Sequence, residues 1–456
     1  MEEVDLFVIG GGSAGMKTAR TVAKMGYKVA VAEAKETGGE CFWAGCIPTK
    51  ALLRAASVWQ MVREASEFGI HAGELHGDFS EAMAYKKRIM QKLAGDSPKD
   101  AGLSKLGALY FNEKASFESA NEIRVGSQVI QAKKVLIATG TDPSIPTIPG
   151  LIEAGFITNR EAVDLEYLPK QIAIIGGGPI GLEFGQIFHR FGAAVTIIES
   201  ASHVLPREDS TVAMLAQESI IRQGISIKTA TSVKSITRSG NCKSLILQTA
   251  MGEERLECDE ILISTGRVPA TKGLNLGAAG LDDDGKALKV DLMLQTPVPS
   301  IYAAGDVTGG YQFTHVASYM GGVAAMNMFG SNPRLADTRV LPRCTYIDPE
   351  VASVGITELE AKAANLPVRV QCAHYSDLDK PVLYNRTEGI VKLIVSAVDD
   401  QILGAHILGD SASSIISEVA VCMQNRLPVQ AIANTMHAFP SFPEVVEAAA
   451  LSKDIC

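Results

Sequence analysis

The stretch DLFVIGGGSAGMKTARTVAKMGYKVAVAE, residues 5–33, decides the fold of this chain. A short apolar run is followed by a glycine-rich turn, a helical stretch to Met25 and a second apolar run that ends at Glu33. This order predicts a βαβ unit. The turn fits a dinucleotide-binding fingerprint through Gly10, Gly12 and Gly15, which would place a pyrophosphate at the helix N-terminus. Glu33 then stands where a ribose needs a hydrogen-bond acceptor.

The same arrangement recurs over residues 172–199, where Gly176, Gly178 and Gly181 form the turn and Glu199 ends the second strand. One such fingerprint is a weak signal, but two in matched strand–turn–helix settings predict two nucleotide sites. Glu199 would repel a 2′-phosphate, and residues 200–203 contain no arginine that could bind one. The second site is therefore expected to prefer NAD over NADP.

A close cysteine pair lies in GGECFWAGCIPTK, residues 38–50. In a regular helix, Cys41 and Cys46 would lie about 8–9 Å apart at Cα, beyond the roughly 7 Å that a disulfide tolerates. The segment must therefore leave helical geometry when the pair is oxidised, and Gly45 gives it that freedom. A strained disulfide is easily reduced. A helix starting near this point and Lys50 would favour thiolates, so we predict a redox-active pair.

The first nucleotide site needs a group that exchanges electrons with both a hydride carrier and a dithiol, and a flavin does both. FAD and NAD are thus the expected cofactors. Further along, residues 135–140, 261–266 and 301–306 each form an apolar strand that ends in a small residue and glycine. We interpret these strands as crossings between domains, with boundaries near residues 151, 268 and 337.

Composition limits the possible functions. The chain has 456 residues, 46% of them hydrophobic and 20% charged, with a formal net charge of −9. This predicts an ordered globular protein without a basic surface for nucleic acid. The sequence has no apolar run of roughly 18 residues that would span a membrane. The acidic start leads directly into a strand pattern, so we expect no leader peptide and a cytoplasmic protein. Eight cysteines are too few for a disulfide scaffold.

The C-terminal third has a different pattern and no nucleotide fingerprint. We expect an α+β domain that serves association or covers a site. The expected strands lie near residues 344–347, 390–395 and 402–408, and the expected helices near residues 357–365, 411–424 and 429–436.

Together, the first fingerprint, the pattern Gly-Gly-x-Cys-x4-Cys-x-Pro-x-Lys, the second fingerprint and Gly305-Asp306 resemble the pyridine nucleotide-disulfide oxidoreductases. Dihydrolipoamide dehydrogenases and mercuric reductases are the most similar members. The resemblance implies an α/β fold with two Rossmann-like dinucleotide-binding domains and a C-terminal α+β dimerisation domain. Residues 1–150 and 269–336 would bind FAD, residues 151–268 would bind NAD, and residues 337–456 would form the interface of a homodimer.

The resemblance also implies roles for individual residues. Cys46 would contact the flavin and Cys41 would exchange with the substrate disulfide. Lys50 and Glu183 would lie as a pair beside the flavin N5 edge, and Asp306 would contact the ribityl chain. The remaining candidate cofactor-binding residues are Ala115, Gly140, Val233, Gly266, Thr314 and His315.

One departure concerns the acid–base group, which in the dehydrogenases is a histidine held by a glutamate near the C-terminus. Here the stretch reads HAFPSFPE, residues 437–444, and Phe439 occupies the histidine position. Glu444 remains as a catalytic candidate. His437 could replace the histidine only if the loop turns differently, and a packed or interface histidine is the alternative. Loss of such a base slows proton transfer by about 10²- to 10⁴-fold. A second departure is Trp43 between the cysteines, which either narrows the approach to Cys41 or packs locally.

Mercuric reductase is the main rival, because residues 312–319, QFTHVASY, resemble it. That family presents a C-terminal cysteine pair to the metal, whereas only Cys456 ends this chain. The other cysteines lack ligand spacing, so we expect them in the core and predict no metal site. They are Cys242, Cys258, Cys344, Cys372 and Cys422.

We therefore predict an FAD enzyme of the dihydrolipoyl dehydrogenase type that passes electrons between NAD(H) and a dithiol/disulfide substrate through Cys41 and Cys46. A protein-bound lipoyl group is the first-choice substrate. The alternatives are a metal-ion reductase like mercuric reductase and a slow NADH-binding redox sensor. A nucleotide transhydrogenase is disfavoured, because such enzymes tend not to keep both thiols.

Overall fold

The computed structural model describes residues 2–71, 73–95, 101–282 and 284–452, so the expected terminal thiol Cys456 lies outside the described residues. Within the described part, packing divides the chain into two compact units. Residues 1–48, 86–144 and 266–338 form the first unit, and residues 49–85, 145–265 and 339–456 form the second. Helices α3 (Cys46–Glu64) and α4 (Phe79–Ala94) each contribute to both units.

The first unit contains a mixed sheet with the strand order β3-β2-β1-β6-β5-β4, and β16 pairs with β6. The strands β1, β2, β3, β6 and β16 run parallel, whereas β4 and β5 are joined antiparallel. Their bounds are β1 (Glu2–Ile9), β2 (Val29–Ala32), β3 (Leu109–Phe111), β4 (Ala115–Phe117), β5 (Glu122–Val125), β6 (Gln128–Ile137) and β16 (Ile301–Ala303). The central strands are nearly continuous apolar runs, as expected for parallel strands buried on both faces.

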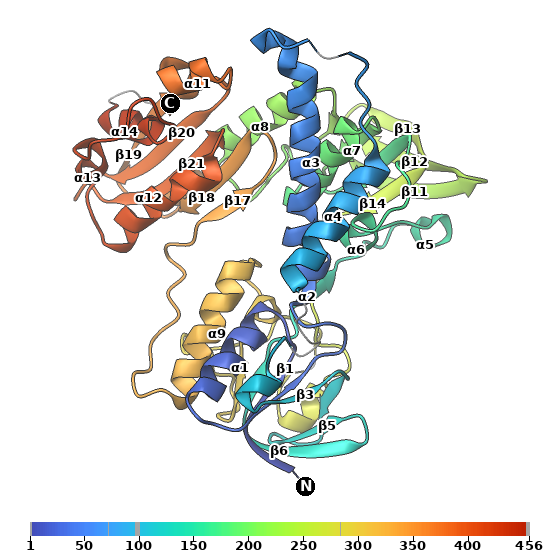
Figure 1. Ribbon diagram of the computed structural model, residues 1–456, viewed down its shortest axis with the longest axis vertical. Helices are drawn as coiled ribbons and strands as arrows, with labels where there is room; N and C mark the ends of the chain where they lie inside the picture. The colour runs from blue at the N-terminus through green and yellow to red at the C-terminus, as the bar shows by residue number, and fades with distance from the viewer. Residues whose placement is uncertain (1, 72, 96–100, 283, 453–456) are drawn as a thin grey trace. The chain divides into compact units, whose positions relative to one another are not determined.

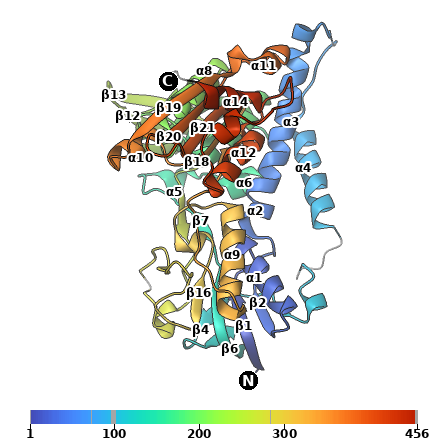
Figure 2. The same ribbon diagram turned by 90° about the vertical axis from the view of Figure 1, so that its left-hand side faces the viewer.

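Helices α1 (Ser13–Lys24) and α9 (Thr314–Phe329) lie side by side in this unit (Figure 1, Figure 2). Their backbones approach closely because Gly321 has no side chain. A Cβ at this position would lie 2.4 Å from the carbonyl oxygen of Ala14. The Thr18 hydroxyl donates to the Gly321 carbonyl oxygen at 2.8 Å. This packing fixes the N-terminus of α9 within the unit that carries the first glycine-rich turn.

Short elements complete the first unit. Strands β7 and β15 pair antiparallel where the chain leaves and re-enters it. The bounds are α2 (Gly39–Trp43), η2 (Ser104–Leu106), β7 (Thr141–Pro143), β15 (Arg267–Pro269), η3 (Leu276–Ala279) and η4 (Asp306–Thr308).

The second unit contains a parallel sheet with the order β10-β9-β8-β14. The helix α7 (Pro179–Arg190) follows β8, and α8 (Ser210–Arg222) precedes β10. An antiparallel sheet, β11-β12-β13, precedes β14 in the chain. The other bounds are η1 (Ala65–Phe68), α5 (Leu151–Ala154), α6 (Asn159–Ala162), β8 (Gln171–Ile175), β9 (Ala194–Ile198), β10 (Ser226–Lys228), β11 (Ser232–Ser239), β12 (Cys242–Thr249), β13 (Gly252–Cys258) and β14 (Glu260–Ile263).

The C-terminal part of the second unit is an antiparallel sheet with the order β17-β18-β21-β20-β19, and α12 and α14 pack against it (Figure 2). The bounds are β17 (Arg343–Thr345), β18 (Glu350–Gly355), α10 (Glu358–Ala363), β19 (Val368–His374), η5 (Tyr375–Asp377), α11 (Asp379–Leu383), β20 (Ile390–Ser396), β21 (Ile402–Gly409), α12 (Ala412–Gln424), α13 (Gln430–Ala433) and α14 (Glu444–Leu451). The expected α+β class is confirmed.

Several elements of this part differ from the sequence-based expectation. Strands β18 and β19 were not predicted, although Val368, Val370 and Cys372 of β19 alternate with polar residues. The helix expected over residues 429–436 ends at Ala433, and α14 was missed because prolines precede it. The cysteines expected in the core divide as follows: Cys258, Cys372 and Cys422 are buried, Cys344 is half-buried, and Cys242 is exposed. The prediction for Cys242 was wrong because it lies at the start of β12.

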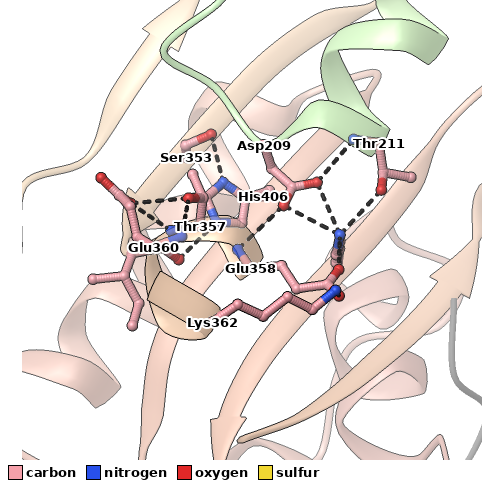
Figure 3. Close-up of polar contacts among 10 residues, drawn as sticks. Asp209, Thr211, Ser353, Thr357, Glu358, Glu360, Lys362 and His406 are labelled. Carbon is pink, nitrogen blue, oxygen red and sulfur yellow. Dashed lines mark hydrogen bonds and ion pairs between the residues drawn. The ribbon is translucent and has the colours of Figure 1, made fainter. Parts of the chain in front are cut away.

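A buried ion network joins α8 to the C-terminal sheet (Figure 3). Lys392 of β20 donates to both carboxylate oxygens of Asp209, at 3.0 and 3.1 Å, and its side chain is only 1% exposed. It also donates to Thr211 Oγ1 at 3.0 Å and to Glu358 Oε2 at 2.7 Å. Burial opposes ionisation of Asp209, but the electrostatic interaction with His406 and the charge and hydrogen bonds of Lys392 outweigh it and lower the pKa of this carboxyl. Asp209 also caps α8, so the network fixes this helix to the sheet.

His406 of β21 lies beside this network and is fully buried. Its Nε2 donates to the carbonyl oxygen of Ile356 at 2.9 Å, which leaves Nδ1 to accept from the Ser353 hydroxyl at 3.1 Å. Both ring nitrogens of the neutral imidazole thus have a hydrogen-bond partner, and burial lowers the pKa of His406.

None of the described helices is long and apolar enough to cross a bilayer.

Candidate active site

The first glycine-rich turn has the geometry that the fingerprint predicts. Gly10 has φ +106°, and a Cβ there would lie 2.4 Å from the carbonyl oxygen of Ala138. A Cβ at Gly15 would lie 1.9 Å from the carbonyl oxygen of Gly10. The first turn of α1 can therefore lie this close to Gly10 only because residue 15 has no side chain. At Gly12, the N-cap of α1, a Cβ would meet nothing within 4 Å, and no side chain caps the helix. Open space beside the first N–H groups of a helix that no side chain caps fits a pyrophosphate.

The second turn repeats this geometry at each position. Gly176 has φ +111°, and a Cβ there would lie 2.4 Å from the carbonyl oxygen of Ser264. A Cβ at Gly181 would lie 2.1 Å from the carbonyl oxygen of Gly176. Gly178 caps α7 with open space beside it and no capping side chain. The residues of both turns therefore fit a dinucleotide.

The two acidic residues are held in the same way by the backbone. Glu33 Oε2 accepts from the Gly11 N–H and Glu199 Oε2 accepts from the Gly177 N–H, each at 2.7 Å. The other oxygen, Oε1, accepts from the Lys35 N–H in the case of Glu33 and from the Ala201 N–H in the case of Glu199, each at 2.8 Å. Each carboxylate thus lies against the backbone of its own turn, at Gly11 and at Gly177, and its role as a ribose acceptor stays a prediction.

The thiol pair belongs to the first unit and lies at a break between two helices. Helix α2 ends at Trp43, and α3 begins at Cys46. Gly45 permits the break, since a Cβ there would lie 2.9 Å from the carbonyl oxygen of Glu40. Cys41 and Cys46 are thiols that are not joined by a disulfide, and Cys41 is less exposed than Cys46. The pKa of Cys41 is raised by its hydrogen bond to Cys46 and by burial.

Two neighbouring side chains define the surroundings of the thiols. The Oγ1 of Thr314, the first residue of α9, lies 3.5 Å from Cys46 Sγ. The indole Nε1 of Trp43 donates to the carbonyl oxygen of Thr37 at 2.9 Å, and the ring packs edge-on against Phe42. Trp43 is thus held by local packing. The ring of His315, which follows Thr314, stacks on Phe313.

Asp306 lies in the first unit with Thr141, whose Oγ1 is 3.5 Å from its Oδ2. Burial raises the pKa of Asp306. Arg267 donates to Thr141 Oγ1 at 2.8 Å and pairs with Glu40 at 3.1 Å. Gly140 and Gly266, at the adjoining strand ends, have positive φ and open space beside them. Sequence reasoning missed Arg267, because a lone arginine after a strand carries no motif.

The salt bridge between Lys50 and Glu183, which the resemblance implied, is present in the second unit. Lys50 Nζ donates to Glu183 Oε2 at 2.7 Å and to Oε1 at 3.0 Å, although Glu183 is only 4% exposed. The Tyr346 N–H donates to Glu183 Oε1 at 3.0 Å, and its ring lies under Lys50 Nζ. The roles of both residues beside a flavin stay predictions.

Ala115 and Val233 lie in sheets rather than at the glycine-rich turns. Ala115 is buried in the core of the first unit, on β4. Val233, on β11, is half-buried against an apolar cluster of the second unit. Their assignment as cofactor-binding residues stays a prediction.

Near the C-terminus, the structure does not bring the two catalytic candidates together. His437 Nε2 lies 3.0 Å from Glu418 Oε1, and its Nδ1 lies 2.9 Å from the Thr435 carbonyl oxygen and 3.3 Å from Glu447. Glu444 instead accepts from the Ser441 N–H at 2.6 Å. His437 is therefore a packed histidine, with a side chain that is 6% exposed. Phe439 is 73% exposed and has no titratable group.

Comparison with known proteins agrees with this geometry. A family model described as pyridine nucleotide-disulphide oxidoreductase matches residues 4–321, and the model of its dimerisation domain matches residues 341–450. The chain is 31% identical to mercuric reductase of Staphylococcus aureus, covering 99% of this chain and 83% of that protein. It is 33% identical to dihydrolipoyl dehydrogenase of Bacillus subtilis (strain 168), covering 99% and 98%.

Solved structures give the same result. The HOCl-induced flavoprotein disulfide reductase RclA from Escherichia coli superposes with a TM-score of 0.87 at 30% identity, over 98% of this chain and 99% of that chain. A Cu(II) complex of the same reductase superposes equally well, at 29% identity. Among the described residues of this chain, no three His, Cys, Asp or Glu side chains form a group that could hold a metal ion.

Proposed function

The chain belongs to the pyridine nucleotide-disulphide oxidoreductases, and we propose that it reduces an external disulfide with electrons from NADH through Cys41 and Cys46. As a member of this family it is a flavoprotein that uses FAD and a nicotinamide nucleotide. The observation that carries the proposal is the reduced thiol pair at the break between α2 and α3, with Cys46 at the N-terminus of a long helix.

The two glycine-rich turns are the proposed cofactor sites. Gly10, Gly12, Gly15 and Glu33 would hold FAD, and Asp306 lies in the same unit. Gly176, Gly178, Gly181 and Glu199 would hold NADH, with Glu199 disfavouring a 2′-phosphate. FAD supplies the two-electron link between NADH and the thiol pair.

The protein's own chemistry is a thiol–disulfide exchange. One sulfur of the reduced pair attacks the substrate disulfide, releasing a first thiol and leaving a mixed disulfide with Cys41. The Cys46 sulfur then attacks Cys41, releasing the second thiol and forming the Cys41–Cys46 disulfide. The substrate gains two electrons and two protons, and the pair loses both. NADH and one proton restore the pair.

The missing acid–base group affects the exchange in both directions. A dithiol substrate must lose protons before it can attack, and the thiols released from a disulfide substrate must gain them. Phe439 can neither accept nor donate these protons, so residues 437–444 do not decide the direction of the reaction.

Oxidation of a protein-bound dihydrolipoyl group is the second candidate. It is favoured by the match to the Bacillus subtilis dihydrolipoyl dehydrogenase over 98% of that protein's length. Reduction of Hg(II) is the third, favoured by the mercuric reductases among the relatives. We also propose a homodimer formed through residues 341–450, the part that matches the dimerisation domain, and a cytoplasmic location.

Anaerobic steady-state assays would decide among these functions. NADH and NADPH are each combined with lipoamide, glutathione disulfide and Hg(II), and dihydrolipoamide is combined with NAD⁺. We expect NADH-dependent disulfide reduction that Cys41→Ser abolishes. Faster oxidation of dihydrolipoamide than reduction of either disulfide would favour the second candidate. NADH oxidation only with Hg(II) would favour the third, and no turnover with any acceptor would indicate a redox sensor.

A further inference from the structure

The short helix α2, which carries Cys41, is not held in place by buried side chains. All five of its residues are described, and none of them is buried. Its N-cap, Gly38, has φ +105° and no side chain that could cap the helix. A single helical turn is unstable by itself, because fixing its backbone costs more conformational entropy than one hydrogen bond returns. Helix α2 therefore depends on contacts with the rest of the first unit.

Backbone and side-chain contacts join the start of α2 to that unit. The Gly38 N–H donates to the Gly11 carbonyl oxygen at 2.9 Å, which links α2 to the first glycine-rich turn. Arg267 Nη2 lies 3.1 Å from Glu40 Oε1, so this ion pair holds the residue directly before Cys41. The side chain of Arg267 is 12% exposed and that of Glu40 is 28% exposed. Water and salt therefore screen this pair less than a fully exposed one.

Arg267 is itself held in place by Thr141. Its Nε donates to Thr141 Oγ1 at 2.8 Å, and its Nη2 donates to the Thr141 carbonyl oxygen at 2.9 Å. The two residues belong to β15 and β7, which pair with each other in the first unit. A guanidinium that is fixed in this way loses little further freedom when it binds a carboxylate. Glu40 thus binds a preorganised cation on a two-stranded sheet.

The position of α2 matters for the step in which Cys46 attacks Cys41. The bond forms only when the two sulfurs meet, so the equilibrium constant for disulfide formation depends on how often they do. Cys46 begins a helix of 19 residues, whereas Cys41 belongs to the one turn of α2. If α2 moves away in the reduced state, this freedom must be lost when the disulfide closes. A contact that holds α2 in the reduced state therefore favours the disulfide.

We propose that Glu40 and Arg267 are positioning residues that hold Cys41 next to Cys46 in the reduced pair and thereby favour closure of the disulfide. The two residues act through α2 and need no contact with substrate. This inference rests on the proposed function, in which the thiol pair is the redox centre. It assigns a role to a carboxylate inside the cysteine motif and to an arginine that carries no motif.

The test is the equilibrium between the thiol pair and glutathione. Full-length holoenzyme is equilibrated anaerobically with mixtures of glutathione and glutathione disulfide, quenched with acid, alkylated and digested for peptide mass spectrometry. Two protein thiols become one disulfide while glutathione disulfide becomes two molecules of glutathione, so atoms and electrons balance.

The variants separate the ion pair from a general effect of charge. Glu40→Gln removes the carboxylate at constant shape, and Arg267→Gln removes its partner. Glu36→Gln is the matched control, because it removes a negative charge from an exposed residue four positions earlier. Arg267→Lys replaces the glutamine variant if the latter does not fold, since it keeps the charge but not the planar fork.

We expect Glu40→Gln and Arg267→Gln each to lower the equilibrium constant for disulfide formation about tenfold, because roughly one residue of backbone gains freedom in the reduced state. This corresponds to a rise in reduction potential of about 30 mV. The double variant should show no further fall, since both changes remove the same contact. Glu36→Gln should match the wild type. An unchanged equilibrium constant in Glu40→Gln, or additive falls in the double variant, would overturn the inference.

Failure of the proposed function would give a different result. Wild-type protein would then yield no peptide linked through Cys41 and Cys46 at any ratio of glutathione to its disulfide. Amide hydrogen exchange over residues 38–45 would still test the two positioning residues, because it reports local opening of α2. We expect about tenfold faster exchange in reduced Glu40→Gln than in wild type or Glu36→Gln. Equal exchange in all three proteins would show that the ion pair does not hold α2.

Discussion

The two βαβ units, β1–α1–β2 and β8–α7–β9, have nearly the same turn but different neighbours. Both turns hold a carboxylate oxygen 2.7 Å from a glycine nitrogen, Gly11 or Gly177, and leave open space beside the next glycine, Gly12 or Gly178. The first helix packs against α9, which brings Thr314 to Cys46. The second helix is tied to the loop before β18, where Gln186 and Arg190 bind Asp348. We expect the turn to make each unit a nucleotide site and the neighbouring element to decide which reaction that nucleotide serves.

The largest expected effect comes from a Cβ at the tightest glycine of each turn. Gly15→Ala places a methyl group 1.9 Å from the Gly10 carbonyl oxygen, and relief requires the turn to move. We expect protein that purifies without flavin absorbance and is destabilised by about 1–3 kcal/mol. Chemical denaturation and the visible spectrum measure both effects.

The matching change in the second unit should separate the two sites. Gly181→Ala, at 2.1 Å from the Gly176 carbonyl oxygen, should leave the flavin bound but abolish its reduction by NADH. Stopped-flow absorbance follows this reduction. If both variants lose flavin, or neither does, the two turns do not serve separate nucleotides.

A smaller effect is expected at the open glycines, Gly12 and Gly178. An added Cβ meets no protein atom within 4 Å there, so Gly12→Ala and Gly178→Ala should fold normally. The methyl group would occupy space that the pyrophosphate needs, and we expect about tenfold weaker binding, or about 1.4 kcal/mol. Titration of apoprotein with FAD, and of holoenzyme with NADH, measures it. Unchanged affinity in either variant would mean that the dinucleotide lies elsewhere.

The carboxylate of Glu199 should decide between NADH and NADPH, whereas the matching carboxylate of the first unit, Glu33, should not. Glu199→Gln removes a negative charge that would face a 2′-phosphate, and the repulsion between two such charges is about 1 kcal/mol at the screening of bulk water. The ratio of kcat/KM for NADH over NADPH should fall about fivefold, whereas Glu33→Gln should leave this ratio unchanged. A fall in both variants would remove the distinction between the units.

The smallest expected effect is on the pH dependence of stability, through His406, which lies beside the ion network of α8. His406 faces Asp209, and the buried pair Arg343 and Glu208 lies nearby. The folded pKa of His406 lies below its ordinary value of 6.5, so the unfolded chain binds more protons below this pH. Stability should therefore be full above pH 6.5 and fall by at most about 1.4 kcal/mol per pH unit below it. His406→Gln should flatten this fall.

Denaturation midpoints at pH 7, 6 and 5 would measure the histidine effect. The lowered pKa of Asp209 adds a separate loss at lower pH, below its ordinary 3.8. An equal slope in wild type and His406→Gln between pH 6.5 and pH 5 would show that His406 does not contribute.

The sequence predicted the features that depend on backbone geometry at a glycine. Gly10 and Gly176 could be placed because only glycine adopts their positive φ against a neighbouring carbonyl, and the break at Gly45 followed from disulfide geometry. The contacts of Thr314 with Cys46, and of Tyr346 with Glu183, join residues far apart in the chain and carry no local signal. The contacts of His437 with Glu418 and Glu447 likewise carry no local signal, and the catalytic roles of His437 and Glu444 stay predictions.

The central claim is that electrons from NADH reach the Cys41–Cys46 pair, and counting thiols tests it most directly. Oxidised holoenzyme is mixed anaerobically with one equivalent of NADH, quenched in denaturant with an alkylating reagent and analysed by mass spectrometry. We predict two new thiols per chain, both at Cys41 and Cys46. Consumption of NADH with no new thiol at either position would contradict this account.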